Sequence, residues 1–204
     1  MKNRIVLSLC DYTGNIVEPW RQNGYECWIV DLKHPSGITE ESGLVKVGAD
    51  IRGWLPPRAD YQIVFAAPPC THLAVSGARW FTEKGLRSLI EGLQLVETCR
   101  LIAEWTEAPY MIENPVSTLS TYWRKPDFTF DPCDYGGYLN PPSDHYTKKT
   151  CLWTGHGFKM PPKRPVKPAK RSWIHLLPPS ENRGDLRSAT PLGFAWAVFE
   201  ANKN

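Results

Sequence analysis

The sequence lacks the features that mark secreted, metal-binding and membrane-spanning proteins. Its six cysteines are widely scattered and include no CxxC pair, and the start of the chain has no apolar run between basic residues and a small-residue cleavage site. No stretch approaches the roughly 20 uninterrupted apolar residues that a membrane-spanning helix needs. No His/Cys cluster has the spacing of metal ligands. We therefore expect a reduced cytoplasmic protein without a metal site or a membrane span.

The sequence also has little net charge and no internal repeat. Its 24 Lys and Arg residues exceed its 21 Asp and Glu residues by only three, so composition gives a weak preference for an anionic partner. A chain of 204 residues with 42% hydrophobic side chains predicts one compact domain over residues 1–204. Nine tryptophans and 19 prolines indicate long, shaped loops around a rigid scaffold.

Short apolar runs alternate with turn signals along the chain, as is typical of buried parallel strands. A longer stretch over residues 84–105 has apolar side chains at helical spacing. This alternation predicts an open α/β sheet with helices on both faces, in which ligands collect at the C-terminal ends of the strands. Strands are expected at residues 4–9, 27–32, 44–47, 61–66, 110–112 and 151–154. The apolar face of the expected helix consists of Leu86, Leu89, Ile90, Leu93, Val96 and Cys99.

A basic, proline-rich stretch follows the last expected strand. It has no acidic residue between residues 155 and 171, and we interpret it as an extended arm that grips nucleic-acid phosphates. For each lysine taken singly, a solvated linker is the competing interpretation, and the absence of a counter-charge favours the arm. Its cations are Lys159, Lys163, Arg164, Lys167, Lys170 and Arg171. A short helix over residues 190–201 is expected to pack back on the domain.

The strongest chemical signal is a cysteine that follows a buried strand and a diproline. Residues 61–67 are mostly apolar and lead into Pro68, Pro69 and Cys70. A thiolate is a strong nucleophile, and a rigid Pro-Pro turn limits the entropy lost in aiming it. The alternative is that Cys70 is a small buried hydrophobic residue.

A carboxyl group ends another expected strand. Glu113 follows Tyr110–Ile112, where partial desolvation would raise its pKa and allow it to act as an acid. Cys70 and Glu113 together suit conjugate addition to a pyrimidine, with the thiolate attacking C6 while the acid protonates N3. A capping or salt-bridge role is the alternative for Glu113.

Two motifs resemble those of one enzyme family. Pro68-Pro69-Cys70, followed by Ser76-Gly77, and Glu113-Asn114-Pro115 are similar to the nucleophile and acid motifs of cytosine-C5 DNA methyltransferases, in the compact form seen among phage proteins. The resemblance implies a Rossmann-like class I methyltransferase sheet, S-adenosylmethionine as cofactor, and methylation of a cytosine flipped out of duplex DNA. It also implies the cytoplasm of a bacterial or phage-infected cell.

The same resemblance implies where the cofactor lies. Residues 9–15 are similar to the first cofactor loop of the family, with fewer glycines than usual. Asp31 matches the acidic residue that holds the ribose hydroxyls, at a spacing that a nucleotide-like cofactor requires in a doubly wound sheet. Asp50 and Ile51 match the pair that binds and covers the adenine, and residues 187–191 resemble the last motif. The implied cofactor contacts are Asp11, Tyr12, Thr13, Gly14, Asp31, Leu32, Asp50, Ile51, Pro68 and Ala189.

The sequence departs from the family pattern at one motif and in one region. Lys148 and Thr150 stand where the family usually has two arginines, so the planar guanidinium normally held near the reacting base is missing, and Lys148 is the catalytic candidate there. The recognition region is reduced to a basic segment over residues 156–183, in which Trp173 and His175 are candidates to stack on an extruded nucleotide. His72 either assists Cys70 or packs on a helix, and residues 140–143 are expected to form a loop.

Two other functions fit the same residues. One is C5 modification of a free pyrimidine nucleotide, which the short recognition region favours. The other is a catalytically silent relative that binds DNA or cofactor, which the glycine-poor first loop and the missing arginines favour. The presence of both Cys70 and Glu113 argues for turnover.

Overall fold

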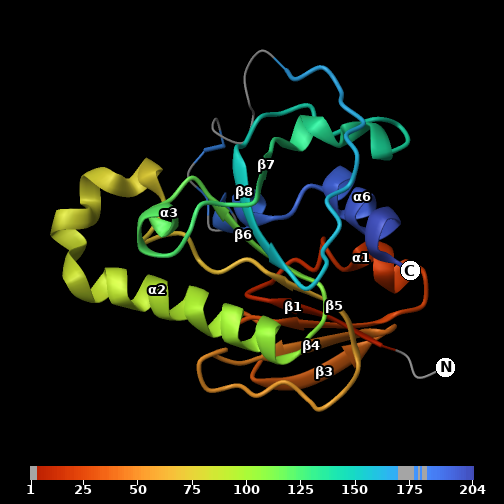
Figure 1. Ribbon diagram of the computed structural model, residues 1–204, viewed down its shortest axis with the longest axis horizontal. Helices are drawn as coiled ribbons and strands as arrows, with labels where there is room; N and C mark the ends of the chain where they lie inside the picture. Colours follow the sequence, from red (N-terminus) through yellow and green to blue (C-terminus); the bar gives the residue numbers. More distant parts are fainter. Residues whose placement is uncertain (1–3, 170–176, 179, 181–182) are drawn as a thin grey trace.

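Five apolar runs form parallel strands in the middle of an eight-stranded sheet (Figure 1). The computed structural model describes residues 4–169, 177–178, 180 and 183–204. The parallel strands are β1 (Ile5–Leu9), β2 (Glu26–Val30), β4 (Leu44–Gly48), β5 (Tyr61–Ala66) and β6 (Tyr110–Pro115). The others, β3 (Gly37–Glu41), β7 (Phe128–Phe130) and β8 (Thr150–Gly155), pair antiparallel with their neighbours. The strand order is β3-β4-β2-β1-β5-β6-β8-β7.

The direction in which the chain adds strands reverses between β1 and β5. From β1 the chain moves outward through β2 to β4, and it then returns to place β5 on the other side of β1. The backbone N–H of Ala67 donates to the carbonyl of Leu9 at 3.0 Å, so the two strands stay paired up to their C-terminal ends. In open α/β sheets a ligand binds outside the strand ends at such a reversal.

Helices cover both faces of the sheet and create one apolar core on each. Helix α2 (Phe81–Trp105) contributes Val96, Cys99 and Ile102 to the first core, which α3 (Leu119–Tyr122) extends. Helices α1 (Glu18–Gln22) and α6 (Leu192–Asn202) bury Trp20 and Phe194 in the second. The expected open α/β sheet with helices on both faces is thereby confirmed. The remaining elements are η1 (Val75–Trp80), η2 (Pro132–Asp134), η3 (Gly136–Tyr138) and α5 (Arg183–Ser188).

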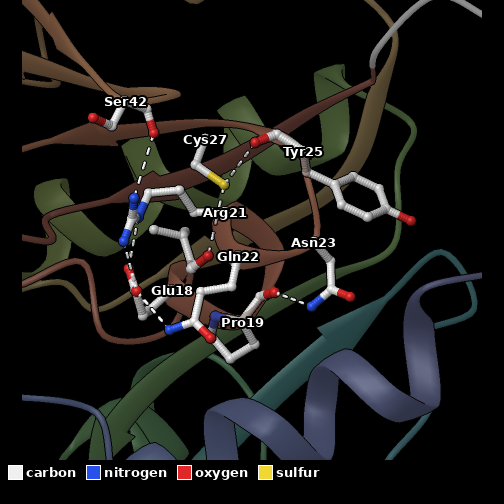
Figure 2. A network of polar contacts seen from close by, with 9 residues as sticks. Glu18, Pro19, Arg21, Gln22, Asn23, Tyr25, Cys27 and Ser42 are labelled. Atoms are coloured by element: carbon white, nitrogen blue, oxygen red, sulfur yellow. Dashed lines mark hydrogen bonds and ion pairs between the residues drawn. The ribbon is translucent and has the colours of Figure 1, made fainter.

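A polar network fixes α1, the helix that follows the loop after β1 (Figure 2). The Arg21 guanidinium donates to both carboxylate oxygens of Glu18, at 2.8 and 2.7 Å, and also contacts the carbonyl of Ser42. The Cys27 thiol lies 3.6 Å from the carbonyl oxygen of Val17. These contacts join α1 to β2 and to the turn between β3 and β4, so the loop that precedes α1 has a fixed base.

Three features differ from the sequence-based expectation. Strands β3 and β7 were not expected, because every residue of β3 is exposed and β7 has only three residues. Helix α2 begins at Phe81 and is interrupted at Gly85, whose φ of 71° is non-helical. The expectation that Leu86 and Ile90 face the core is wrong: they are 71% and 55% exposed, because they lie just after this interruption.

Among the described residues, no helix combines the length and apolar character needed to cross a membrane.

Candidate active site

The loops that follow β5 and β6 are tied together at the C-terminal edge of the sheet. The side-chain amide of the buried Asn114 donates to the carbonyl of Pro68 at 3.0 Å. Farther along, the backbone N–H of Thr118 donates to the carbonyl of Leu73, also at 3.0 Å. Asn114 adjoins Glu113, and Pro68 lies two residues before Cys70. The two candidate residues are therefore held on adjoining, hydrogen-bonded segments.

Cys70 is a half-buried thiol within reach of three charges. Its carbonyl accepts hydrogen bonds from the backbone of Leu73 and Ala74, at 2.9 and 2.8 Å, which forms a tight turn around it. Burial raises the pKa of the Cys70 thiol, the Glu113 carboxylate raises it further, and the positive charge of Lys148 opposes both. In the unliganded protein the thiol form of Cys70 is therefore favoured.

Glu113 is the acidic partner in this group. Burial raises the pKa of its carboxyl, and Lys148 lowers it by a smaller amount. No hydrogen-bond donor among the described residues contacts this carboxyl group. It is therefore able to carry a proton at higher pH than an ordinary glutamate, and no described residue forms a hydrogen bond with that carboxyl group.

Lys148 reaches the same edge because β8 pairs antiparallel with β6. The register places Thr150 opposite Pro115, so the residues that precede β8 lie near the C-terminal end of β6. Thr150 is buried, and its hydroxyl donates to the carbonyl of Lys148 at 2.9 Å. Thr150 therefore shapes the backbone that carries Lys148. Cys70, Glu113 and Lys148 therefore lie close enough for their charges to affect one another.

One residue of this group was missed as a neighbour of Cys70. The Arg187 guanidinium, at the end of α5, lowers the pKa of the Cys70 thiol together with Lys148. Arg187 was placed only in the last motif, which was expected to lie beside the cofactor. Positions 148 and 150 lack arginine, and this absence could have indicated that another segment supplies a guanidinium near Cys70.

The loop after β1 is built around the buried carboxyl of Asp11. The Ser8 hydroxyl and the Gly14 backbone N–H each donate to it at 2.8 Å, and the Thr13 hydroxyl donates at 3.3 Å. Burial raises the pKa of Asp11, and these hydrogen bonds oppose the rise. Gly14 has a φ of 70°, a conformation that favours glycine. Asp11, Thr13 and Gly14 thus hold the loop in shape, while the Tyr12 side chain is 46% exposed.

Residues near the C-terminal end of β2 meet the C-terminal part of the chain. The Asp31 carboxylate accepts a hydrogen bond from the backbone N–H of Lys33 at 2.8 Å, and the Lys33 ammonium forms an ion pair with Asp185 of α5. Leu32 is 67% exposed. The side chain of Asn15 donates to the carbonyl of Thr190 at 3.0 Å, which brings Ala189 close to the first loop. The last motif therefore lies over the loops that follow β1 and β2.

The other expected cofactor contacts differ in how much of each residue is accessible to a ligand. Asp50 follows β4, and its carboxylate is engaged by the Arg52 guanidinium, which lowers its pKa. Ile51 is only 4% exposed and packs in the core on the α2 side, so little of it is free to cover a ligand. Pro68 is buried, and its carbonyl is occupied by Asn114. The Asp31 and Asp50 carboxylates are both partly exposed.

The basic arm is extended as expected, but two of its cations have partners, which corrects the expectation of a segment without counter-charge. The Lys163 ammonium lies 3.0 Å from the Asp134 carboxylate, and the Arg164 guanidinium lies 3.4 Å from that of Glu200. These acidic residues come from other parts of the chain, which a segment-by-segment count of charge does not capture. Lys170, Arg171, Trp173 and His175 lie outside the described residues.

The two remaining described cations of the arm lie at different ends of the sheet. Lys159 lines a polar cavity of 440 Å³. The same cavity is lined by Arg4, Asp60 and Pro109, which directly precede β1, β5 and β6, so it lies at the N-terminal edge of the sheet, opposite Cys70. Lys167 is exposed, and its carbonyl accepts a hydrogen bond from His145. The four described cations of the arm therefore do not form one surface around the candidate site.

The structure also places the cysteines, His72 and residues 140–143. All six cysteines are free, and the thiols of Cys10 and Cys99 lie 4.0 Å apart. His72 packs against α2, where a Cβ at Gly92 would lie 3.3 Å from its Cβ. Residues 140–143 form a loop, as expected. In the part of the chain that the structure describes, no cluster of His, Cys, Asp or Glu has the arrangement of a metal site.

Comparisons with known proteins give only distant matches. No protein-family model matches the chain, and no curated protein matches it. Among solved structures, it is similar to the CcbJ methyltransferase from Streptomyces caelestis, with a TM-score of 0.34 and 17% identity over 64% of this chain and 50% of that one. A second match is the glycopeptide N-methyltransferase MtfA, with a TM-score of 0.31 and 12% identity over 74% of this chain and 64% of that one. The chain thus spans less than two thirds of either protein, and similarity at this level does not identify its activity or cofactor.

Proposed function

We propose that this chain is a DNA (cytosine-5)-methyltransferase that uses Cys70 as a transient nucleophile and S-adenosylmethionine as the methyl donor. The observation that carries the proposal is that a half-buried thiol and a desolvated carboxyl lie on two strand-end segments joined by the hydrogen bond from Asn114 to the Pro68 carbonyl, where each affects the charge of the other. An acid and a nucleophile with perturbed pKa values that lie close together are typical of catalytic sites. The proposal also draws on the resemblance of the Pro68-Pro69-Cys70 and Glu113-Asn114-Pro115 motifs to that enzyme family.

The chemistry follows from the opposite needs of the two groups. The Cys70 thiolate forms a bond to C6 of cytosine, and the protonated Glu113 transfers its proton to N3, so that the ring does not accumulate negative charge. While Glu113 is protonated, the charge that raises the Cys70 pKa is absent. Lys148 and Arg187 stabilise the thiolate at the same stage. After C5 has been methylated, a water molecule takes the C5 proton, the C5=C6 double bond re-forms as the C6–S bond breaks and its electrons return to the Cys70 sulfur, and N3 returns its proton to the Glu113 carboxylate, which regenerates the free enzyme.

The residues of the first three strand ends fit the proposed cofactor. Asp11 shapes a tight loop after β1, while Asp31 and Asp50 offer carboxylates beyond β2 and β4, where hydroxyl and amine groups of a nucleoside would donate. When bound, S-adenosylmethionine supplies an electrophilic methyl group to C5 of the activated ring. To bind the cofactor, the Asp50 carboxylate must exchange at least one of its hydrogen bonds with Arg52 for a hydrogen bond with the ligand. In the absence of the ligand, the Arg52 guanidinium holds the carboxylate in place.

A free pyrimidine nucleotide is the second candidate substrate. The ion pairs of Lys163 and Arg164 favour it, because they reduce the unpaired positive charge available for a phosphate backbone. The chemistry at Cys70 and Glu113 would be the same for either substrate. The two candidates therefore differ in whether the pyrimidine ring belongs to DNA or to a free nucleotide, and covalent trapping distinguishes them.

The decisive experiment is covalent trapping with 5-fluorocytosine. Fluorine at C5 prevents the last elimination, so a working enzyme accumulates as a protein adduct in the presence of S-adenosylmethionine. We expect mass spectrometry to show an adduct on Cys70 with duplex DNA containing 5-fluorocytosine and none with the Cys70→Ala variant. Cys133→Ala, which removes a cysteine of η2 outside the candidate site, is the matched control and should still form it.

Each other outcome rejects part of the proposal. An adduct with 5-fluoro-dCMP but not with DNA would identify the free nucleotide as the substrate. No adduct with either, under conditions where calorimetry shows that the cofactor binds, would indicate a binding protein without turnover.

A further inference from the structure

The interruption of α2 creates a cavity next to the segment that carries Cys70. Gly85 has a φ of 71°, and a Cβ there would meet no atom within 4 Å, so its backbone conformation rather than lack of space favours glycine. The residues before it form a separate turn (Figure 1), which the Lys84 ammonium joins to the Thr71 carbonyl at 2.7 Å. The resulting cavity measures 440 Å³, within the range of small-molecule sites.

Two residues that line this cavity each carry a buried polar atom that the described part of the chain leaves unpartnered. The His72 Nδ1 and Thr118 Oγ1 atoms are buried, and neither has a hydrogen-bond partner among the described residues. A buried polar group without a partner costs about 1–3 kcal/mol, so native proteins rarely retain one without reason. An imidazole nitrogen and a hydroxyl can each donate or accept, which fits a ligand whose edge carries both kinds of group.

Apolar and aromatic side chains form another part of the cavity wall, beside the polar side chains of Thr82, Lys84 and Ser88. Phe81 and Tyr122 supply rings, and Leu86, 71% exposed, supplies an aliphatic surface. Leu86 is one of the positions that helical periodicity predicted to face the core. A ligand with a planar apolar face and a polar edge would cover the rings and satisfy the two unpartnered atoms together.

Position and charge identify the class of this ligand. His72 lies two residues after Cys70, and Thr118 lies five residues after Glu113, so the cavity adjoins the proposed reaction site. Lys84 lines the cavity, and Arg79 stands over the Trp80 ring at 4.9 Å in the neighbouring turn, so cations for a phosphate lie beside it. Planar faces, mixed donor and acceptor edges and a phosphate are the features of a nucleotide.

We propose that this cavity binds the nucleobase adjacent to the target cytosine, a base that is extruded together with the cytosine from a duplex or is already unpaired in a single strand. The inference rests on the proposed function and adds to it the means of substrate recognition. Stacking on Phe81 and Tyr122 provides affinity, and His72 and Thr118 contact the base edge. Recognition of a neighbouring base within the catalytic core would explain how a short recognition segment suffices.

The test compares single-stranded pentanucleotides with a central cytosine. One has four thymines around it, and two others carry an abasic analogue immediately before or after the cytosine. Fluorescence anisotropy without cofactor measures binding alone. We expect one of the two abasic oligonucleotides to bind about tenfold more weakly than the intact one, because base–aromatic stacking contributes about 1–3 kcal/mol.

Matched variants link that difference to the cavity. Leu86→Ala and Leu101→Ala remove the same side chain from exposed positions of α2, inside and outside the cavity. Leu86→Ala should reduce the difference between intact and abasic oligonucleotides, and Leu101→Ala should preserve it. Thr118→Val should weaken binding of the intact oligonucleotide without loss of thermal stability, because its hydroxyl has no partner among the described residues.

Two outcomes would overturn the inference, and both are separable from failure of the proposed function. Equal affinity for all three oligonucleotides, or equal effects of Leu86→Ala and Leu101→Ala, would leave the cavity to another kind of ligand. Adduct formation is measured separately, with 5-fluorocytosine in the same oligonucleotides. Adducts that form without regard to the neighbouring base would reject only the cavity, whereas neighbour-dependent binding without any adduct would reject only the covalent chemistry.

Discussion

Asp11 in the loop after β1 and Glu113 near the end of β6 both carry desolvated carboxyl groups, and they differ in their hydrogen bonds. Burial raises the pKa of both Asp11 and Glu113. Asp11 accepts hydrogen bonds from Ser8, Thr13 and the Gly14 backbone. Glu113 is balanced only by the charge of Lys148, with no donor among the described residues in contact with it.

This difference separates a structural carboxyl from a reactive one. Hydrogen bonds from a tight loop commit the oxygens of Asp11 to the protein, and the loop depends on them. A carboxyl that is desolvated and free of donors is able to give its proton to a ligand instead. Both groups would look alike in a search for buried acids, and their contacts distinguish them.

The largest expected effect comes from removing the acid without removing its shape. Glu113→Gln should lower the rate of adduct formation about 10²- to 10⁴-fold, the usual contribution of a general acid. A carboxyl whose folded pKa is raised stabilises the protein below its unfolded pKa and loses that contribution as pH rises. The thermal unfolding midpoint of Glu113→Gln at neutral pH should therefore not fall. A lower midpoint with an unchanged rate would make Glu113 a structural residue like Asp11.

Asp11 should show the opposite behaviour. Asp11→Ala leaves the Gly14 N–H and the Ser8 hydroxyl without their buried acceptor, which should lower the free energy of unfolding by about 1–3 kcal/mol. Asp11→Asn keeps an oxygen for the Gly14 N–H and should lose less. Urea denaturation measures both. Equal stability of the alanine variant and the wild type would show that the loop does not depend on this carboxyl.

The electrostatic link between Cys70 and its neighbours gives a smaller, directional effect. Above the pKa of Glu113, its carboxylate raises the Cys70 pKa, so Glu113→Gln should move the pH profile of Cys70 alkylation to lower pH, by about one unit. Lys148→Met removes a charge that lowers the Cys70 pKa and should move the profile to higher pH. Alkylation by iodoacetamide, followed on the Cys70 peptide by mass spectrometry, measures both. Shifts in the same direction would contradict the arrangement of charges.

Local sequence patterns predicted the frame and the central pair but not the contacts between distant segments. Apolar runs bounded by turns identified all five parallel strands, because strands buried on both faces need continuous apolar sequence. Cys70 and Glu113 each follow such a run, so parallel strand ends bring them to one edge. Strand β3 has no such signal, since it is exposed and exists through its pairing with β4.

One missed feature depends on a distant chain segment, and the others depend on local conformation. Arg187 reaches Cys70 from the C-terminal part of the chain, whereas Arg52 engages Asp50 from only two residues away. Leu86 and Ile90 fit the periodicity of a buried face, yet Gly85 interrupts the helix before them. Periodicity reports which side chains share a face, whereas tertiary packing decides whether that face is covered.

The smallest expected effect compares two lysines within the basic arm. Lys167 is exposed and has no ion pair within the described residues, whereas Lys159 lies at the N-terminal edge of the sheet. If the arm holds DNA beside Cys70, Lys167→Ala should reduce the slope of log affinity against log salt by about one, the value for one lost phosphate contact, and Lys159→Ala should leave it unchanged. Filter binding from low to moderate salt measures the slopes. Equal slopes for both variants and the wild type would separate the arm from the nucleic acid and leave recognition to the edge that carries Cys70, Lys148 and Arg187.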